Sequence, residues 1–139
     1  MIFIGIDPGT HTGIAVWDSE EKKFLYMETL PIHRALNVVD LWNRKHSGRV
    51  MVIFEDARKR KTFRQEYGNI AKLQGAGSIK RDCSIWEDFL TDLDIPFQSP
   101  PPSIGNTKPR PEYFAKLTGW KERTSNHARD AAMIVFGRK

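Results

Sequence analysis

The stretch MIFIGIDPGT (residues 1–10) decides the fold. Its first part is apolar and rich in branched side chains, which predicts a buried strand over residues 1–6. The strand is followed by Asp7, Pro8 and Gly9, which are typical of a turn. A carboxylate is therefore expected at the end of a strand that is otherwise apolar.

Two further strands are predicted directly after this turn. Residues 13–18 and 23–30 are separated by a polar turn, and with the first strand they predict an antiparallel meander. Apolar residues recur near helical spacing over residues 33–45, which predicts a crossover helix. Residues 50–54 form a dense run of branched and aromatic residues, typical of a strand covered on both faces. That strand delivers Glu55 to its end.

The second half of the chain alternates helical patterns with one short strand. Residues 66–93 predict one long helix or two shorter ones, depending on the Gly-Ala-Gly sequence at 75–77. Residues 95–98 are expected to form a short strand, and residues 111–117 and 126–136 two more helices, the last capped by Ser125 or Asn126. The order predicts a single α/β domain over residues 1–139, with a five-stranded mixed sheet flanked by helices.

Composition is that of a soluble globular protein. Hydrophobic residues make up 40% of the 139 residues and charged residues 28%. The apolar opening is too short for a signal peptide or a spanning helix, so we expect a protein that stays where it is made, without a membrane partner. Cys83 is the only cysteine, which favours the reducing cytoplasm and a buried thiol.

The net charge of +5 favours a polyanionic partner, and the cations are concentrated directly after Glu55. We expect phosphate contacts from this segment and from a second basic pair further along the chain. The predicted DNA-binding residues are Arg58, Lys59, Arg60, Lys61, Phe63, Arg64, Lys80 and Arg81. Others expected to close the surface from the opposite side are Lys108, Arg110, Lys121, Arg123 and Arg129. Phe63 either stacks on an unpaired base or packs locally on the long helix.

Asp7 and Glu55 each end a strongly apolar strand. Side chains at strand ends gather at one edge of a mixed sheet, and close carboxylates repel each other unless a cation such as Mg²⁺ lies between them. Taken alone, Asp7 is also compatible with an ordinary turn residue and Glu55 with a solvated strand end. His127 and Asp130 lie three positions apart, hence on one face of the last predicted helix. Such a pair is a weak signal by itself, and the two strand-end acids strengthen it.

Three stretches resemble one known family. They are Ile4-Gly5-Ile6-Asp7-Pro8-Gly9-Thr10 with Thr12-Gly13, Val52-Ile53-Phe54-Glu55, and His127-Ala128-Arg129-Asp130-Ala131-Ala132. In this order, along almost the whole chain, they resemble the RuvC-like Holliday junction resolvases of the ribonuclease H-like superfamily. The resemblance implies an endodeoxyribonuclease of DNA recombination and repair that leaves 5′-phosphate and 3′-hydroxyl ends. It also implies two Mg²⁺ ions, replaceable by Mn²⁺, held by Asp7, Glu55 and Asp130. His127 would be a further ligand or an aid to the attacking water, because some members carry an acid at this position.

The chain departs from the better-known cellular members in two ways. It is shorter, and the segment after Glu55 is compact and very basic, as in members from phages and prophages, so the cytoplasm of a bacterial or phage-infected cell is the expected setting. These departures leave open whether four-way junctions are strictly selected. The two-fold symmetry of a junction predicts a homodimer. Its expected surface on the long helix comprises Ile85, Trp86, Phe89 and Leu90.

Three other functions remain as alternatives. One is a nuclease of the same fold that cuts flaps or other branched DNA. Another is a nucleotide-binding domain like those of actin and hexokinase, which share an Asp-x-Gly-Thr motif after a strand but need two such domains around the nucleotide. The third is a non-catalytic DNA-binding module, which the intact set of Asp7, Glu55, His127 and Asp130 disfavours.

Overall fold

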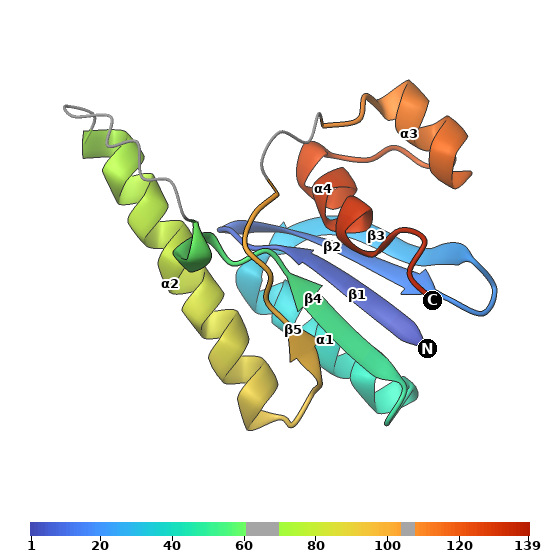
Figure 1. Cartoon of the computed structure of the whole chain (residues 1–139), viewed down its shortest axis with the longest axis horizontal. Coiled ribbons are helices and arrows are strands. Elements are labelled where there is room, and N and C mark those ends of the chain that lie inside the picture. The colour runs from blue at the N-terminus through green and yellow to red at the C-terminus, as the bar shows by residue number, and fades with distance from the viewer. Residues whose placement is uncertain (61–69, 104–107) are drawn as a thin grey trace.

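The computed structural model describes residues 1–60, 70–103 and 108–139, and only the backbone of residues 70–74. A mixed sheet of five strands, in the order β3-β2-β1-β4-β5, forms its centre (Figure 1). The strands are β1 (Ile2–Asp7), β2 (His11–Asp18), β3 (Lys23–Pro31), β4 (Val50–Phe54) and β5 (Phe97–Gln98). The first three pair antiparallel, whereas β4 is parallel to both β1 and β5. The predicted meander joined to parallel strands is confirmed.

The helices also lie close to their predicted positions. They are α1 (Ile32–Lys45), the short 3-10 helix η1 (Ala57–Lys59), α2 (Ile70–Asp92), α3 (Pro111–Thr118) and α4 (Asn126–Val135). The described part of the long helical region is one continuous helix that passes through Gly75 and Gly77. No described atom lies within 4 Å of the place where a Cβ of either glycine would be, so these glycines neither break the helix nor admit a close neighbour.

Alternating side chains of the sheet supply two cores, one on each face. The first core contains Ile4 and Ile6 of β1 together with Val39 of α1 and Trp86 of α2. The second contains Ala15 and Ile53 of the sheet with Phe114 of α3 and Ala131 of α4. Its other buried members are Trp17, Phe24, Ala132 and Val135. In Figure 1, α1 and α4 accordingly lie on opposite faces of the sheet. Asp7 alternates with Ile6 along β1, so its side chain belongs to the face that α4 covers.

The apolar face of α2 is occupied by the protein's own sheet. Trp86 and Leu90 are fully buried in the first core, and Phe89 packs against it. This corrects the prediction of a dimer surface for Trp86 and Leu90, because both are already covered within the chain. Ile85 and Phe89 are half-buried, and for them the dimer surface stays a prediction. Cys83 is buried, as predicted. Within the ranges given above, no helix is both long and apolar enough to cross a membrane.

Two glycines of the sheet allow α4 to lie unusually close. A Cβ atom on Gly5 would fall 2.1 Å from the carbonyl oxygen of Ala131, and one on Gly13 would fall 1.9 Å from that of His127. Any larger residue would therefore push α4 away from β1 and β2. On the helix side, the small residues Ala131 and Ala132 permit the same approach, and both are fully buried.

Candidate metal centre

Asp7 is the last residue of β1, and the turn behind it is held by a buried side chain. Thr12 is fully buried, and its hydroxyl donates to the carbonyl oxygen of Gly9 at 2.7 Å. Asp7 pairs in the sheet with Gly13, whose missing side chain leaves space for the backbone of His127. The geometry of the turn therefore places the Asp7 carboxylate beneath the start of α4.

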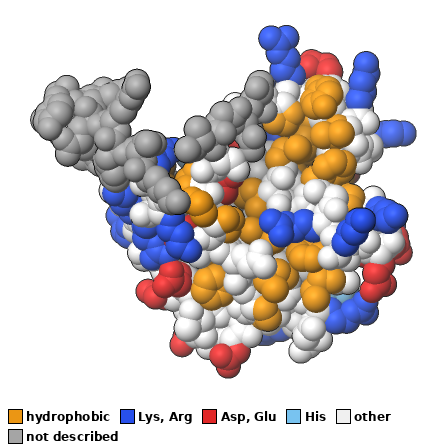
Figure 2. Space-filling model, in the orientation of Figure 1, with side chains coloured by type: hydrophobic (Ala, Val, Ile, Leu, Met, Phe, Trp, Pro, Cys, Tyr) orange, Lys and Arg blue, Asp and Glu red, His pale blue; other side chains and the backbone are white. Residues whose placement is uncertain are grey.

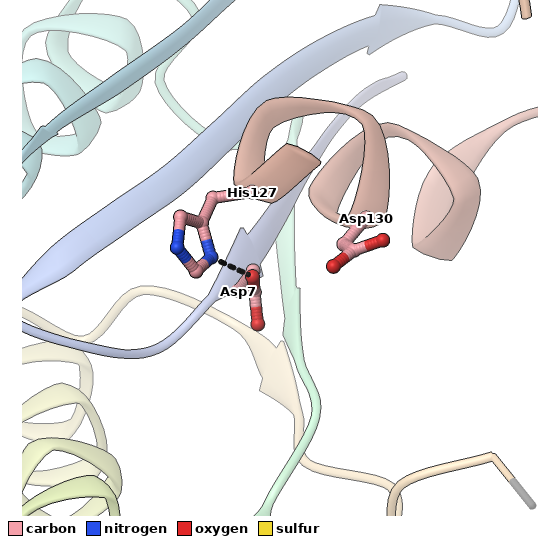
Figure 3. A group of neighbouring side chains, drawn as sticks. All are labelled: Asp7, His127 and Asp130. Carbon is pink, nitrogen blue, oxygen red and sulfur yellow. Dashed lines mark hydrogen bonds and ion pairs between the residues drawn. The ribbon is translucent and has the colours of Figure 1, made fainter. Parts of the chain in front are cut away.

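The first turns of α4 supply the two other members of the group. Ser125 caps this helix, as one of the two predicted candidates, and its Oγ accepts from the backbone N–H of Ala128 at 3.2 Å. His127 and Asp130 both project from α4 toward Asp7 (Figure 3). One ligand atom from each of the three residues lies within 4.8 Å of the others. His127 Nδ1 is 2.9 Å from Asp7 Oδ2.

Glu55 lies beside this group and outside its 4.8 Å limit. It follows the last residue of β4, on the same face of the sheet as the buried Ile53. Burial raises the pKa of Glu55, and the negative charges of Asp7 and Asp130 raise it further, against a hydrogen bond from the backbone of Ser103. The structure therefore gathers all four predicted site residues at one edge, with Glu55 coupled to the others through their charges.

The carboxylates of the acidic group have little positive charge beside them. Burial raises the pKa of Asp7 above its ordinary value, the hydrogen bond with His127 opposes this, and the charge of Asp130 adds to it. Lys108 supplies a positive charge to this group, because its Nζ lies 3.0 Å from Asp130 Oδ2. This contact raises the pKa of Lys108. Lys108 was expected on the DNA surface, and its pairing with Asp130 was missed.

The donor set fits a divalent cation. Asp7, Glu55 and Asp130 offer carboxylate oxygens, which hard cations such as Mg²⁺ prefer, and His127 offers an imidazole nitrogen. Burial, and then the negative charge of neighbouring carboxylates, raises the pKa of Asp7 and of Glu55, so both effects disfavour the charged forms of these two groups in the metal-free protein. A bound cation would remove that repulsion.

Arg58 has a structural role that differs from the predicted phosphate contact. Its guanidinium donates to both carboxylate oxygens of Asp56, each at 2.8 Å, and also contacts Glu87 on α2. Asp56 is fully buried. With two carboxylates already compensating its charge, Arg58 is a poor phosphate ligand, because binding DNA would require breaking these contacts.

The other predicted DNA contacts fall into three groups. Arg60 ends η1 with an exposed side chain, and Lys59 beside it donates from Nζ to the Ser99 carbonyl at 2.6 Å. Lys80 and Arg81 lie on α2, and Arg81 is largely exposed, 3.7 Å from Asp82. Figure 2 shows Lys and Arg side chains gathered where η1 meets α2. Lys61, Phe63 and Arg64 lie outside the described residues.

A cavity of about 670 Å³ between α3 and the start of α4 includes none of the four site residues. Its lining includes Arg129, which is only 6% exposed and donates to Thr124 and Asn126. Arg129 therefore holds the loop before α4 in place, which corrects its expected place on the DNA surface. Within the acidic group, His127 is exposed and Asp7 and Asp130 are half-buried.

The fold is similar to that of one solved complex in particular, "T. thermophilus RuvC in complex with Holliday junction substrate". The two chains are 18% identical with a TM-score of 0.60, and the match covers 99% of this chain and 92% of that chain. The protein therefore has a RuvC-like fold of the ribonuclease H-like class, as predicted. No protein-family model and no curated protein matches the sequence.

Proposed function

We propose that this protein is a Mg²⁺-dependent endodeoxyribonuclease that cleaves four-way (Holliday) junctions in DNA recombination and repair. One observation carries the proposal: Asp7, His127 and Asp130 bring ligand atoms within 4.8 Å of one another on a RuvC-like fold. The charge coupling of Glu55 to Asp7 and Asp130 adds a third carboxylate. The RuvC of the similar structure is bound to a Holliday junction, which supports branched DNA as the substrate class.

The acidic residues would hold two divalent cations between them. When bound, such cations lower the pKa of a water molecule and stabilise the leaving oxygen of an in-line displacement. Asp7 contributes from β1, Glu55 from the residue after β4 and Asp130 from α4, so the ligands come from three separate parts of the fold. Ligands fixed by separate rigid elements keep their geometry when the substrate binds.

Lys108 has two successive partners in this proposal. Without a cation, its ammonium group compensates Asp130 at 3.0 Å. Its side chain is 71% exposed, so it is free to turn toward solvent once a cation binds Asp130. It would then contact a phosphate of the DNA backbone next to the cleavage site.

The role of His127 is either that of a nitrogen ligand or that of a base for the attacking water. Replacing it with aspartate separates these roles, because a carboxylate can replace a metal ligand but is a weaker base near neutral pH. If His127 is a ligand, His127→Asp retains most of the cleavage rate while His127→Ala loses it. If His127 is the base, both variants lose the rate to a similar extent.

The direct test is cleavage of a synthetic four-way junction in Mg²⁺. Asp7→Asn and Glu55→Gln are each expected to lose at least about 100-fold in rate, since each removes a charge that holds the cations. Asp18→Asn, the same change at the exposed end of β2, is the matched control and is expected to cleave like the wild type. Wild-type rates in both site variants, or no cleavage by the wild type, would refute the proposal.

Substrate selectivity is tested by comparing a four-way junction with a flap and a linear duplex. The proposal expects faster cleavage of the junction than of either alternative. Equal rates on junction and flap would instead identify a branched-DNA nuclease of the same fold without strict four-way selectivity. The junction-selective enzyme and the general branched-DNA nuclease would share the same acidic group, so only the comparison of substrates separates them.

A homodimer remains part of the proposal, since symmetric cuts in a junction require two sites. It must use a surface other than Trp86 and Leu90, which are buried in the first core. Analytical ultracentrifugation with and without junction DNA is expected to show a dimer on the DNA. A monomer under both conditions would contradict this.

A further inference from the structure

We propose that the ion pair between the buried Asp56 and Arg58 is a positioning device for Glu55, and through Glu55 for the metal centre. The inference rests on the proposed function, because it assigns Asp56 and Arg58 a task only if Glu55 binds a cation. Neither residue contacts the acidic group in the contacts described above. Both act through the backbone that follows β4.

Glu55 lies just beyond the paired part of the sheet. The ladder between β1 and β4 ends at the pair Ile6 and Phe54, and the ladder between β4 and β5 ends at Ile53 and Gln98. Glu55 is thus one residue past the last paired residue of β4. A ligand displaced by even about 1 Å loses much of its function, so the position of its backbone has to be fixed by other contacts.

The ion pair fixes the chain immediately after Glu55. The side chain of Asp56 is fully buried and accepts from Arg58 three times, from Nε at 2.8 Å, from Nη2 at 2.8 Å and from the backbone N–H at 3.0 Å. This closes η1 into a rigid loop directly behind β4. A two-pronged guanidinium–carboxylate contact restricts orientation as well as distance.

The same pair attaches this loop to α2. Arg58 contacts Glu87, and its Nη1 donates to Ser84 Oγ at 3.3 Å. The thiol of Cys83, one residue away on α2, lies 3.8 Å from the carbonyl oxygen of Glu55 itself. Glu55 is therefore held from the α2 side both directly and through Arg58.

The opposite side of the loop is attached to the segment after β5. The backbone N–H of Asp56 donates to the carbonyl of Pro100 at 2.8 Å, and Lys59 Nζ contacts Ser99 Oγ at 2.8 Å. Ser103 of the same segment hydrogen-bonds Glu55. Glu55 thus lies between two attachment points, and Asp56 takes part in both.

Stability alone is a weak reason to bury the carboxylate of Asp56. The cost of removing a paired charge from water often matches or exceeds the attraction within the pair, and apolar residues of similar volume are frequently as stable. A fixed orientation is the property that apolar packing supplies less well. The position of the pair, one residue after Glu55, is where such orientation is useful.

The test measures Mn²⁺ affinity by titration with electron paramagnetic resonance, without DNA, well below the unfolding temperature. Arg58→Gln is expected to weaken Mn²⁺ binding about 10-fold, in the range of supporting residues around metal ligands. Its cleavage rate at saturating junction should fall by a similar factor, while junction affinity in the absence of metal stays within about twofold of wild type. A purely structural role would lower the unfolding temperature without changing the Mn²⁺ affinity of the folded protein.

Arg49→Gln is the matched control. Arg49 pairs with Glu20 at 2.6 Å just before β4, and both side chains are more than half exposed. The same substitution there should leave Mn²⁺ affinity unchanged. If Arg58→Gln does not fold, Asp56→Asn replaces it, since the amide keeps the side-chain size and the acceptor for the Arg58 backbone N–H.

The outcomes separate the inference from the proposed function. If the wild type binds no Mn²⁺, the proposed function fails first. If the wild type binds Mn²⁺ and the folded variant at Arg58 or Asp56 binds it as tightly as Arg49→Gln does, the inference is overturned. Weaker binding in that variant alone supports it.

Discussion

Glu55 and Asp56 are neighbours in sequence and have opposite electrostatic surroundings. The carboxylate of Asp56 is enclosed by protein donors, and its bonds to Arg58 hold its pKa below the ordinary value. The carboxylate of Glu55 faces away from that pair, toward Asp7 and Asp130, and burial with their charges raises its pKa. One residue of strand alternation separates these two environments.

The difference distinguishes a structural acid, Asp56, from the acid that the proposed function makes a metal ligand, Glu55. Asp56 has a protein cation of its own, so it needs no ion from solution. The acidic edge brings together Asp7, Glu55 and Asp130. Among the described residues, its basic partners are His127, which contacts Asp7, and Lys108, which contacts Asp130. The negative charge of the three carboxylates thus exceeds the positive charge beside them. A bound divalent cation would compensate this excess.

Displacing α4, which carries His127 and Asp130, should have the largest effect on both stability and cleavage. Gly13→Ala places a Cβ within 1.9 Å of the His127 carbonyl, so we expect a loss of about 3 kcal/mol in the free energy of unfolding, together with loss of cleavage. Urea denaturation measures the first. Gly75→Ala on α2, where the Cβ meets open space, is the control and should stabilise by about 1 kcal/mol. Equal stability of the two variants would contradict the close contact of α4.

The structural side of the comparison is tested at Asp56. Asp56→Ala leaves the Arg58 guanidinium with Glu87 and Ser84 as partners, so we expect a loss of about 2–3 kcal/mol in unfolding free energy. Glu20→Ala breaks the exposed pair with Arg49 and should cost under about 1 kcal/mol. If urea denaturation gives equal losses for both, Asp56 is not the structural acid described here.

The proposed ligand acids are tested at Asp7. Its substitution should change stability less than Asp56→Ala does, and should raise stability instead of lowering it. Because the fold raises the pKa of Asp7, its contribution to stability is present below the ordinary pKa and is lost as pH rises through the raised pKa. At neutral pH the ionised carboxylate therefore opposes folding. Asp7→Asn should unfold at a higher temperature than wild type in EDTA at pH 7, and the difference should shrink in acid.

Differential scanning calorimetry with added Mg²⁺ completes this test. Mg²⁺ should raise the unfolding temperature of the wild type by mass action and leave that of Asp7→Asn nearly unchanged. A variant less stable than wild type in EDTA at pH 7 would show that Asp7 is a structural acid like Asp56.

Most of the fold could be predicted from the sequence because local patterns determine it. The apolar run before Asp7 and the one before Glu55 both became strands at the predicted positions, and the helical spacing of α1 and α4 held to within a residue or two. The proximity of the four predicted site residues could also be predicted, since two of them follow apolar strand sequences and two share a helix face.

What the sequence did not reveal depends on contacts between distant residues. Arg58 looks like one cation in a basic run, and only the folded chain brings it to Asp56 and Glu87. The apolar sequence of α2 is compatible with a dimer surface or with a core. In the folded chain Trp86 is fully buried in the core. Lys108 pairs with Asp130 across segments that no periodicity connects.

The most direct test of the acidic edge as a cation site is a crystal of the wild-type protein soaked in Mn²⁺, with anomalous diffraction used to find the ion. We predict an anomalous peak coordinated by Asp7 and Asp130, with Glu55 at the same or an adjacent peak, and none at Asp56. Peaks absent from the acidic edge, or a peak at Asp56 and Glu87 instead, would contradict the account.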